Sequence, residues 1–103
     1  EILKLRTQLL QTRSRIAAET RKSLLEVEKA ATARDLARAD LDLTREQLGV
    51  YLAQLEEGRI PMVKVEELRV MENQKWIGYY DALRAYEQAK LLAARHAGTL
   101  VAM

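Results

Sequence analysis

Apolar residues recur every three or four positions from the start of the chain to Leu48, and neither glycine nor proline interrupts this stretch. Such spacing gathers apolar side chains on one side of an α-helix, so the pattern predicts one long helix over residues 1–57. Several apolar rows repeat at seven-residue intervals: Leu3, Leu10, Ala17, Leu24 and Ala31, then Leu41, Leu48 and Leu55, with Leu36, Leu43 and Val50 beside them. This surface is wider than the seam of a two-stranded coiled coil, and we expect neighbours on more than one side of the helix.

The first combined glycine and proline signal is Glu57-Gly58-Arg59-Ile60-Pro61. Glycine just past a helix end can adopt the left-handed conformation that closes the helix, and proline cannot continue a preceding helix. We therefore predict a tight turn at residues 58–61, where the chain reverses direction.

A second helix is predicted over residues 62–98, ending at Gly98, with residues 99–103 as a tail. Glu66 and Glu67 fall near its start, and Arg95 and His96 near its end, where each charge suits the helix dipole. Antiparallel pairing places Leu55 near Val63, Leu48 near Val70 or Met71, Leu41 near Ile77, and Leu36 near Leu83. The main stripe of this helix, with spacings of three, four and seven, comprises Val65, Leu68, Glu72, Tyr79, Ala82, Tyr86, Ala89 and Ala93.

The predicted fold is thus all-α: a long antiparallel helical hairpin, similar to a coiled coil, with arms of unequal length. Composition agrees, since 103 residues include only four glycines, one proline and no cysteine. The 17 basic and 15 acidic residues are spread along the chain, so the sequence does not predict a nucleic-acid-binding patch. We expect no membrane-spanning segment in this chain. Because the first residue is Glu1, we expect a fragment of a larger protein.

The sequence contains few of the residue combinations that catalysis requires. His96 is the single histidine, and the cysteines that complete many zinc sites are missing. Acidic pairs such as Glu66 and Glu67 are adjacent along a helix, where neighbouring side chains point in different directions. The chain is therefore expected not to be an enzyme and to hold neither a metal nor a cofactor. We expect His96 to lie on the surface or to interact with the helix dipole.

Two other groups of residues are candidates for a binding function. Trp76, Tyr79, Tyr80 and Tyr86 lie together on the second helix with Gly78, and aromatic residues at helical spacing favour packing over ligand stacking. The turn is the stronger candidate, because carboxylates at the end of the first helix oppose its dipole. The predicted partner-docking tip comprises Glu56, Glu57, Gly58, Arg59, Ile60 and Pro61.

Four segments have a recognisable order and spacing: Leu41-Asp42-Leu43-Thr44-Arg45-Glu46-Gln47-Leu48, Leu55-Glu56-Glu57-Gly58-Arg59-Ile60, Tyr80-Asp81-Ala82-Leu83-Arg84-Ala85-Tyr86-Glu87-Gln88-Ala89 and Arg95-His96-Ala97-Gly98-Thr99-Leu100. In these segments the chain resembles the TolC-type family of outer-membrane efflux proteins, which form trimeric channels in Gram-negative bacteria. In that family a long helix descends to a periplasmic tip, turns at a glycine and returns as a shorter helix. Gly58 matches the tip glycine.

The resemblance implies a periplasmic segment of an outer-membrane protein, in which three parent chains assemble hairpins into a hollow α-barrel. Its tip would dock a periplasmic adaptor, also called a membrane fusion protein, of a tripartite export pump. The exported substrate and the cognate pump do not follow from the resemblance. Two alternatives stay open: the α-hairpin of the adaptor itself, and a generic cytosolic coiled-coil scaffold.

Overall fold

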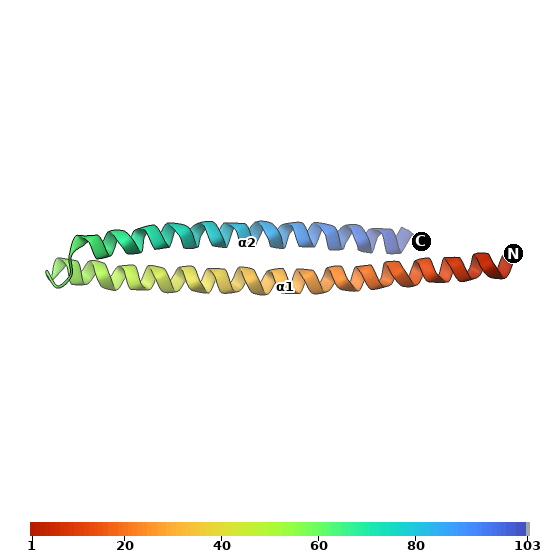
Figure 1. Cartoon of the computed structure of the whole chain (residues 1–103), viewed down its shortest axis with the longest axis horizontal. Coiled ribbons are helices and arrows are strands. Elements are labelled where there is room, and N and C mark those ends of the chain that lie inside the picture. The colour runs from red at the N-terminus through yellow and green to blue at the C-terminus, as the bar shows by residue number, and fades with distance from the viewer. Residues whose placement is uncertain (103) are drawn as a thin grey trace. The chain divides into compact units, whose positions relative to one another are not determined.

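The chain forms two helices joined by a short turn (Figure 1). The computed structural model describes residues 1–102, with side chains as far as Gly98. Helix α1 spans Ile2–Glu56 and has 55 residues, and helix α2 spans Met62–Ala102 and has 41 residues. The fold is an all-α antiparallel helical hairpin with arms of unequal length, as the sequence predicted.

Helix α2 begins at Met62 as predicted and continues to Ala102. Gly98 does not end it: the helix continues through Gly98, which lacks the positive φ that Gly58 adopts at the end of α1. A glycine inside a helix costs only about 1 kcal/mol relative to alanine, which a long helix tolerates. The predicted end at Gly98 and the predicted tail are therefore wrong over residues 99–102, and Met103 lies outside the described residues.

The charges predicted to suit the dipole of α2 lie outside its terminal turns. Its first turn holds no acidic residue and its last turn holds no basic residue. Glu66 and Glu67 lie in the second turn, and Arg95 and His96 lie more than one turn before Ala102. The field of the helix dipole falls off within the terminal turn, so these charges gain little from it.

The chain divides into two compact units, which we describe separately. The tip unit comprises residues 32–84 and contains the turn. Its seam is formed by α1 residues at alternating spacings of three and four, with Leu41 and Thr44 buried and Leu48 and Leu55 partly buried. Val65 and Leu68 provide the buried side chains of α2. The predicted row Leu41, Leu48 and Leu55 is confirmed as part of this seam.

The predicted stripe of α2 is confirmed in each unit. All of its members are buried or partly buried: Val65, Leu68, Glu72, Tyr79 and Ala82 in the tip unit, and Tyr86, Ala89 and Ala93 in the other unit. Spacings of three, four and seven residues therefore identified the side of α2 that packs against α1.

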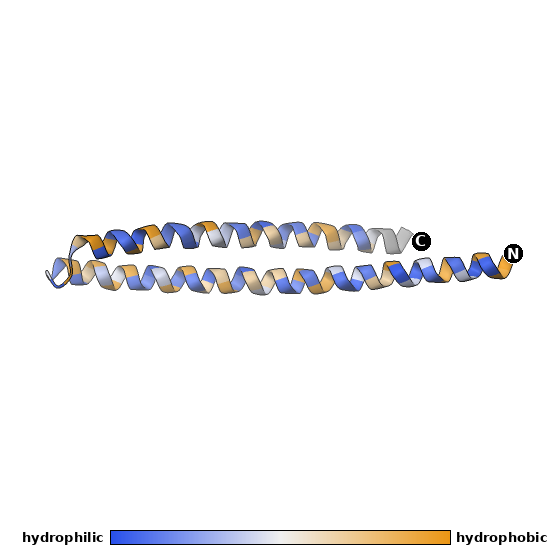
Figure 2. Ribbon diagram, in the orientation of Figure 1, coloured by the Kyte–Doolittle hydropathy of each residue, from blue (hydrophilic) through white to orange (hydrophobic). Residues whose placement is uncertain are grey.

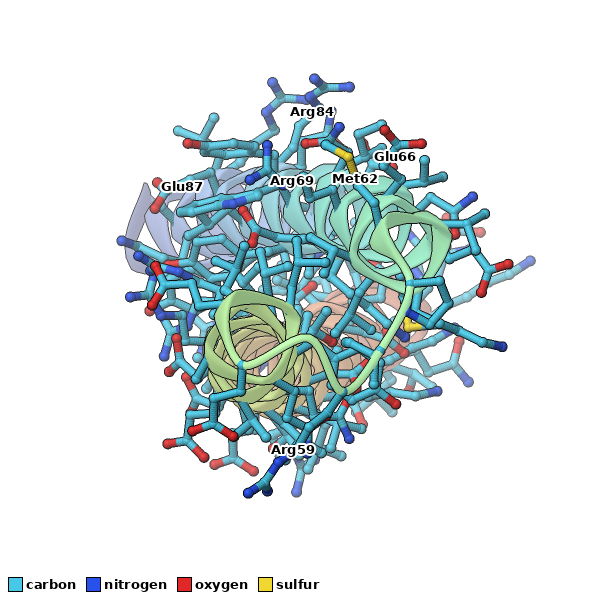
Figure 3. All side chains as sticks on the ribbon, turned by 90° about the vertical axis from the view of Figure 1, so that its left-hand side faces the viewer. Arg59, Met62, Glu66, Arg69, Arg84 and Glu87 are labelled. Atoms are coloured by element: carbon cyan, nitrogen blue, oxygen red, sulfur yellow. The ribbon has the colours of Figure 1, made fainter. Side chains whose placement is uncertain are left out.

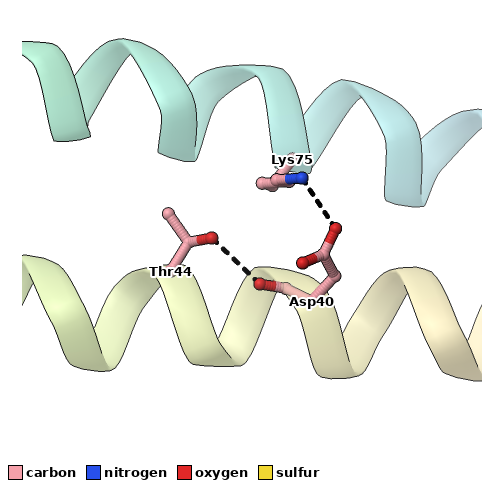
Figure 4. A network of polar contacts seen from close by, with 3 residues as sticks. All are labelled: Asp40, Thr44 and Lys75. Atoms are coloured by element: carbon pink, nitrogen blue, oxygen red, sulfur yellow. Dashed lines mark hydrogen bonds and ion pairs between the residues drawn. The ribbon is translucent and has the colours of Figure 1, made fainter.

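The predicted pairing has the correct level along the helices, but each predicted pair includes one residue that lies on the outer face. Asp40 Oδ2 lies 2.7 Å from Lys75 Nζ across the seam, which fixes the level (Figure 4). However, Val63, Val70 and Ile77 are exposed, because each lies two positions before a stripe residue. Two positions correspond to about 200° of rotation around a helix, which places these side chains on the outer face. The predicted contacts of Leu55 with Val63, Leu48 with Val70 or Met71, Leu41 with Ile77 and Leu36 with Leu83 therefore do not form the seam.

Two buried threonines satisfy their hydroxyl groups within α1. Thr44 Oγ1 donates to the Asp40 carbonyl oxygen at 3.0 Å (Figure 4), and Thr20 Oγ1 donates to the Ile16 carbonyl oxygen at 2.9 Å. This bond to the residue four positions earlier is common for threonine within helices. A polar residue can therefore occupy the seam without requiring a polar partner on α2.

The terminal unit comprises residues 1–31 and the part of the chain that follows Arg84. Thr20 and Ser23 of α1 and Ala93 of α2 are its buried residues. The first turns of α1 extend beyond the end of α2 (Figure 1), and every side chain from Glu1 to Gln11 is exposed. This part of α1 has no packing partner among the described residues.

Gly49 and Gly78 lie inside helices and neither is required by the hairpin. A Cβ atom built on either glycine meets no heavy atom within 4 Å. We predict that Gly49→Ala and Gly78→Ala each raise the free energy of unfolding by about 0.5–1 kcal/mol, because alanine loses less backbone entropy in a helix. Urea unfolding followed by circular dichroism measures the change. Destabilisation by either alanine would show that the glycine serves the hairpin itself.

Candidate functional site

The turn closes α1 with a Schellman motif, which is a defined pattern of backbone hydrogen bonds after a helix. The Arg59 N–H donates to the Gln54 carbonyl oxygen at 2.9 Å, and the Gly58 N–H donates to the Leu55 carbonyl oxygen at 3.0 Å. Gly58 has φ +73°, the left-handed conformation that this motif requires and that glycine adopts without a steric cost. The sequence prediction of a glycine-closed turn is thus confirmed in its geometry.

Charges at the tip are partly balanced. The Glu57 carboxylate pairs with Arg59, with 2.9 Å between Oε2 and Nε. The predicted conflict between Glu57 and the dipole of α1 is therefore relieved by a neighbouring cation. Figure 3 looks at the turn end-on and shows Arg59 pointing away from the helices, and its side chain is 71% exposed although it pairs with Glu57.

The other predicted tip residues surround this pair. Glu56 is the last residue of α1 and is exposed, and Ile60 is partly buried beneath the turn. Pro61 immediately precedes α2, and its carbonyl oxygen accepts a hydrogen bond from the Lys64 N–H at 3.1 Å. Five of the six residues are thus exposed, and Ile60 is the partly buried member.

A second group of functional interest lies on the side of the tip unit. The Trp76 and Tyr80 rings are stacked, with centroids 5.6 Å apart, and Tyr79 meets Trp76 edge-on at 6.4 Å. Two arginines of α1 cover these rings: Arg38 Cζ lies 5.4 Å from the Tyr79 centroid, and Arg45 Cζ lies 5.7 Å from the Trp76 centroid. We call these five residues the aromatic–arginine cluster.

The cluster supports the packing interpretation of the aromatic residues. Trp76 and Tyr79 are partly buried and joined to α1 by cation–π contacts, each worth about 0.5–1 kcal/mol at an exposed site. Tyr80 is the exposed member. Tyr86 belongs to the terminal unit, where Lys90 Nζ lies 5.0 Å from its ring centroid, and Gly78 has no close neighbour.

His96 packs against α1 in the terminal unit, which corrects the expectation of a surface or dipole role. Its Nδ1 is hydrogen-bonded to the buried Ser23 Oγ at 2.5 Å, and its side chain is partly buried. The two residues line a surface hollow of about 210 Å³ together with Glu19, Lys22, Glu26 and Leu92. The serine–histidine pair resembles part of a hydrolytic site, but backbone N–H groups inside a helix are already bonded and cannot stabilise an oxyanion.

This contact leads to a prediction about stability. We expect Ser23→Ala to lower the free energy of unfolding by about 1 kcal/mol, because it removes a hydrogen bond between the helices. Thr20→Val is the matched variant and should cost close to nothing, since Thr20 Oγ1 bonds mainly within its own helix and lies 3.5 Å from the His96 carbonyl oxygen. Urea unfolding of both variants measures the two changes in the free energy of unfolding. Equal decreases would contradict the assigned role of Ser23.

Comparison of the chain with models of protein families, with curated proteins and with solved structures found no match. Within residues 1–102, neither helix is both long and apolar enough to cross a membrane. The function must therefore be argued from the surfaces of the hairpin.

Sequence reasoning missed the arginines of the aromatic–arginine cluster and the partner of His96. Arg38 and Arg45 are seven residues apart, which was the signal that they share one side of α1. Ser23 belongs to the seven-residue row that contains Ala30, Ala37 and Thr44. A search restricted to apolar rows passes over both signals.

Proposed function

We propose that this chain is a non-catalytic wall segment of a TolC-type outer-membrane efflux channel, lying on its periplasmic side. In this proposal the hairpin packs side by side with other hairpins of a trimeric parent protein. Its tip, formed by Glu56, Glu57, Gly58, Arg59, Ile60 and Pro61, docks a periplasmic adaptor protein.

The observation that carries the proposal is the amount of apolar surface left exposed in the tip unit. Two rows at seven-residue spacing are more than half exposed: Leu36, Leu43 and Val50 on α1, and Val63, Val70 and Ile77 on α2. Neither row faces the seam, so the hairpin does not need them for its own packing. Regular apolar rows on the outer faces of both helices favour further helices as neighbours, which is the situation of a wall segment.

The tip supports a docking role through its shape and chemistry. The Schellman motif fixes the backbone, so the exposed Arg59 guanidinium is presented from a rigid turn. Preorganised loops lose less conformational entropy on binding. Arginine is enriched at the energetically important positions of protein interfaces.

The test is photo-crosslinking in cells, with a photoreactive amino acid at position 59 or position 70 of the full-length protein that carries this chain. We expect position 59 to capture a periplasmic adaptor and position 70 to capture copies of the same protein. Capture of an outer-membrane channel from position 59 would instead identify the chain as the adaptor hairpin. Capture of cytosolic proteins alone would favour a coiled-coil scaffold and overturn the proposal.

A further inference from the structure

The first three turns of α1 continue the two rows that face α2 elsewhere, and every side chain from Glu1 to Gln11 is exposed. The row through Ser23 continues toward the N-terminus as Ile16, Leu9 and Ile2, and the row through Thr20 continues as Arg13 and Arg6. Leu9 is 51% exposed and Ile2 is 73% exposed. Figure 2 shows the resulting alternation of apolar and polar bands near the N-terminus.

The apolar side of this segment is broad. Leu3 and Leu10 lie next to the second row and are 77% and 65% exposed. With 100° of rotation per residue, Arg6 and Arg13 fall between Ile2 and Leu9 on one side and Leu3 and Leu10 on the other. Two guanidinium groups, one heptad apart, therefore lie in the middle of an exposed apolar stripe.

The charge of the segment has one sign. Residues 1–16 contain the basic side chains Lys4, Arg6, Arg13 and Arg15, and their single acidic side chain is Glu1. Arg6 and Arg13 form no ion pair in the part of the chain that the structure describes. Any helix that covers the stripe must therefore supply its own carboxylates, because burying an unpaired charge is costly.

From this arrangement we propose that the N-terminal stripe of α1, defined as Ile2, Leu3, Arg6, Leu9, Leu10 and Arg13, binds an acidic amphipathic helix of a partner protein. Leucine and isoleucine side chains of the stripe pack against the apolar side of that helix. Carboxylates spaced seven residues apart on the partner pair with Arg6 and Arg13. The inference concerns residues outside the tip and does not depend on the proposed efflux function.

Charge complementarity favours this occupant over a second copy of the chain. If two copies of the segment paired antiparallel about their middle, Arg6 of one copy would lie opposite Arg13 of the other. In a parallel pair each arginine would meet its own counterpart. Both arrangements bring guanidinium groups together inside an apolar seam, where like charges are strongly unfavourable.

The same positions disfavour a lipid surface. A helix that lies on a membrane carries its basic residues on the polar side, at the level of the headgroups. Lys4 and Arg15 meet that requirement, but Arg6 and Arg13 lie within the apolar side. A partner helix can place a carboxylate at these two points, whereas acyl chains cannot.

The test uses the 103-residue chain and two labelled synthetic helices of about 21 residues, long enough to form stable helical pairs. Both peptides carry leucine along the seam; one has glutamate at the positions opposite Arg6 and Arg13, and the other has lysine there. Fluorescence anisotropy gives each dissociation constant. We expect the glutamate peptide to bind at least about tenfold more tightly than the lysine peptide.

Two double variants of equal charge identify the responsible side of the helix. Arg6→Glu/Arg13→Glu should reverse the preference between the peptides, and Lys4→Glu/Arg15→Glu should preserve it. All four side chains are exposed, and circular dichroism checks that both variants fold. The proposal is overturned if the glutamate peptide does not bind, or if both double variants change the preference equally.

The other occupants are tested with the same variants. Co-sedimentation with phosphatidylglycerol vesicles that is lost in Arg6→Glu/Arg13→Glu but kept in Lys4→Glu/Arg15→Glu would make a lipid surface the occupant. Self-association in sedimentation equilibrium that is lost in Ile2→Ser/Leu9→Ser would make a second copy the occupant. Either result would overturn the proposal of an acidic partner helix.

Discussion

Replacing Leu41 with alanine is expected to lower the free energy of unfolding by about 3 kcal/mol. Leu41 is 0% exposed and is one of two fully buried large side chains in the described part of the chain, the other being Val65. A two-helix seam contains few residues, so the cavity left by the leucine cannot be filled by rearrangement of a larger core. This substitution should have the largest effect on stability of those that we predict.

Leu36→Ala provides the matched control, because it deletes the same atoms from the same helix. Leu36 is 71% exposed, so its replacement should change the free energy of unfolding by less than about 0.5 kcal/mol. Urea unfolding of both variants measures the difference directly. Equal losses would mean that the seam does not distinguish Leu41 from the outer row, and the assignment of the two faces would be wrong.

The comparison of Leu41 with Leu36 also shows what the sequence could and could not predict. Uninterrupted helical spacing and the combination of Gly58 with Pro61 predicted both helices and the turn. Spacings of three, four and seven residues also predicted the buried stripe of α2. These features depend on local backbone geometry and on periodicity, which can be read without knowledge of the partner helix.

The sequence could not predict in the same way which apolar rows of α1 face α2 and which face outward. This helix has more apolar positions than one seam can cover, so several rows compete to face α2. Thr44 and Ser23 occupy seam positions where their hydroxyl groups are satisfied, whereas Leu36, Leu43 and Val50 are excluded from the seam. Apolarity alone therefore does not identify which row faces the partner when polar seam residues can form hydrogen bonds.

The tip residues were identified from the sequence as a candidate site, but their interactions were not. The sequence indicated two unfavourable carboxylates at the end of α1, and the pairing of Glu57 with Arg59 became visible only with the turn geometry. Because the Schellman motif positions Arg59 next to Glu57, the charge balance of the tip depends on the backbone conformation of Gly58. This dependence makes Gly58 the most informative position in the turn.

Gly58→Val is expected to lower the free energy of unfolding by about 2 kcal/mol and, under the proposed function, to reduce capture of an adaptor from position 59. Valine is branched at Cβ and is strongly disfavoured at φ +73°, whereas the space around the Cβ position is open. The penalty is therefore one of backbone conformation and not of steric contact with other residues. Relief of the strain would disrupt the hydrogen bond from the Arg59 N–H to the Gln54 carbonyl oxygen.

Gly58→Asn tests whether the turn needs the left-handed conformation or needs glycine itself. Asparagine adopts the left-handed conformation more readily than valine. We expect this variant to retain most of the stability and most of the adaptor capture, measured by urea unfolding and by the yield of crosslinked adaptor. If Gly58→Val lowers stability but leaves capture unchanged, the docking contact does not depend on the turn. Loss of capture in both variants, with stability retained in Gly58→Asn, would instead mean that the partner approaches the glycine too closely for any side chain.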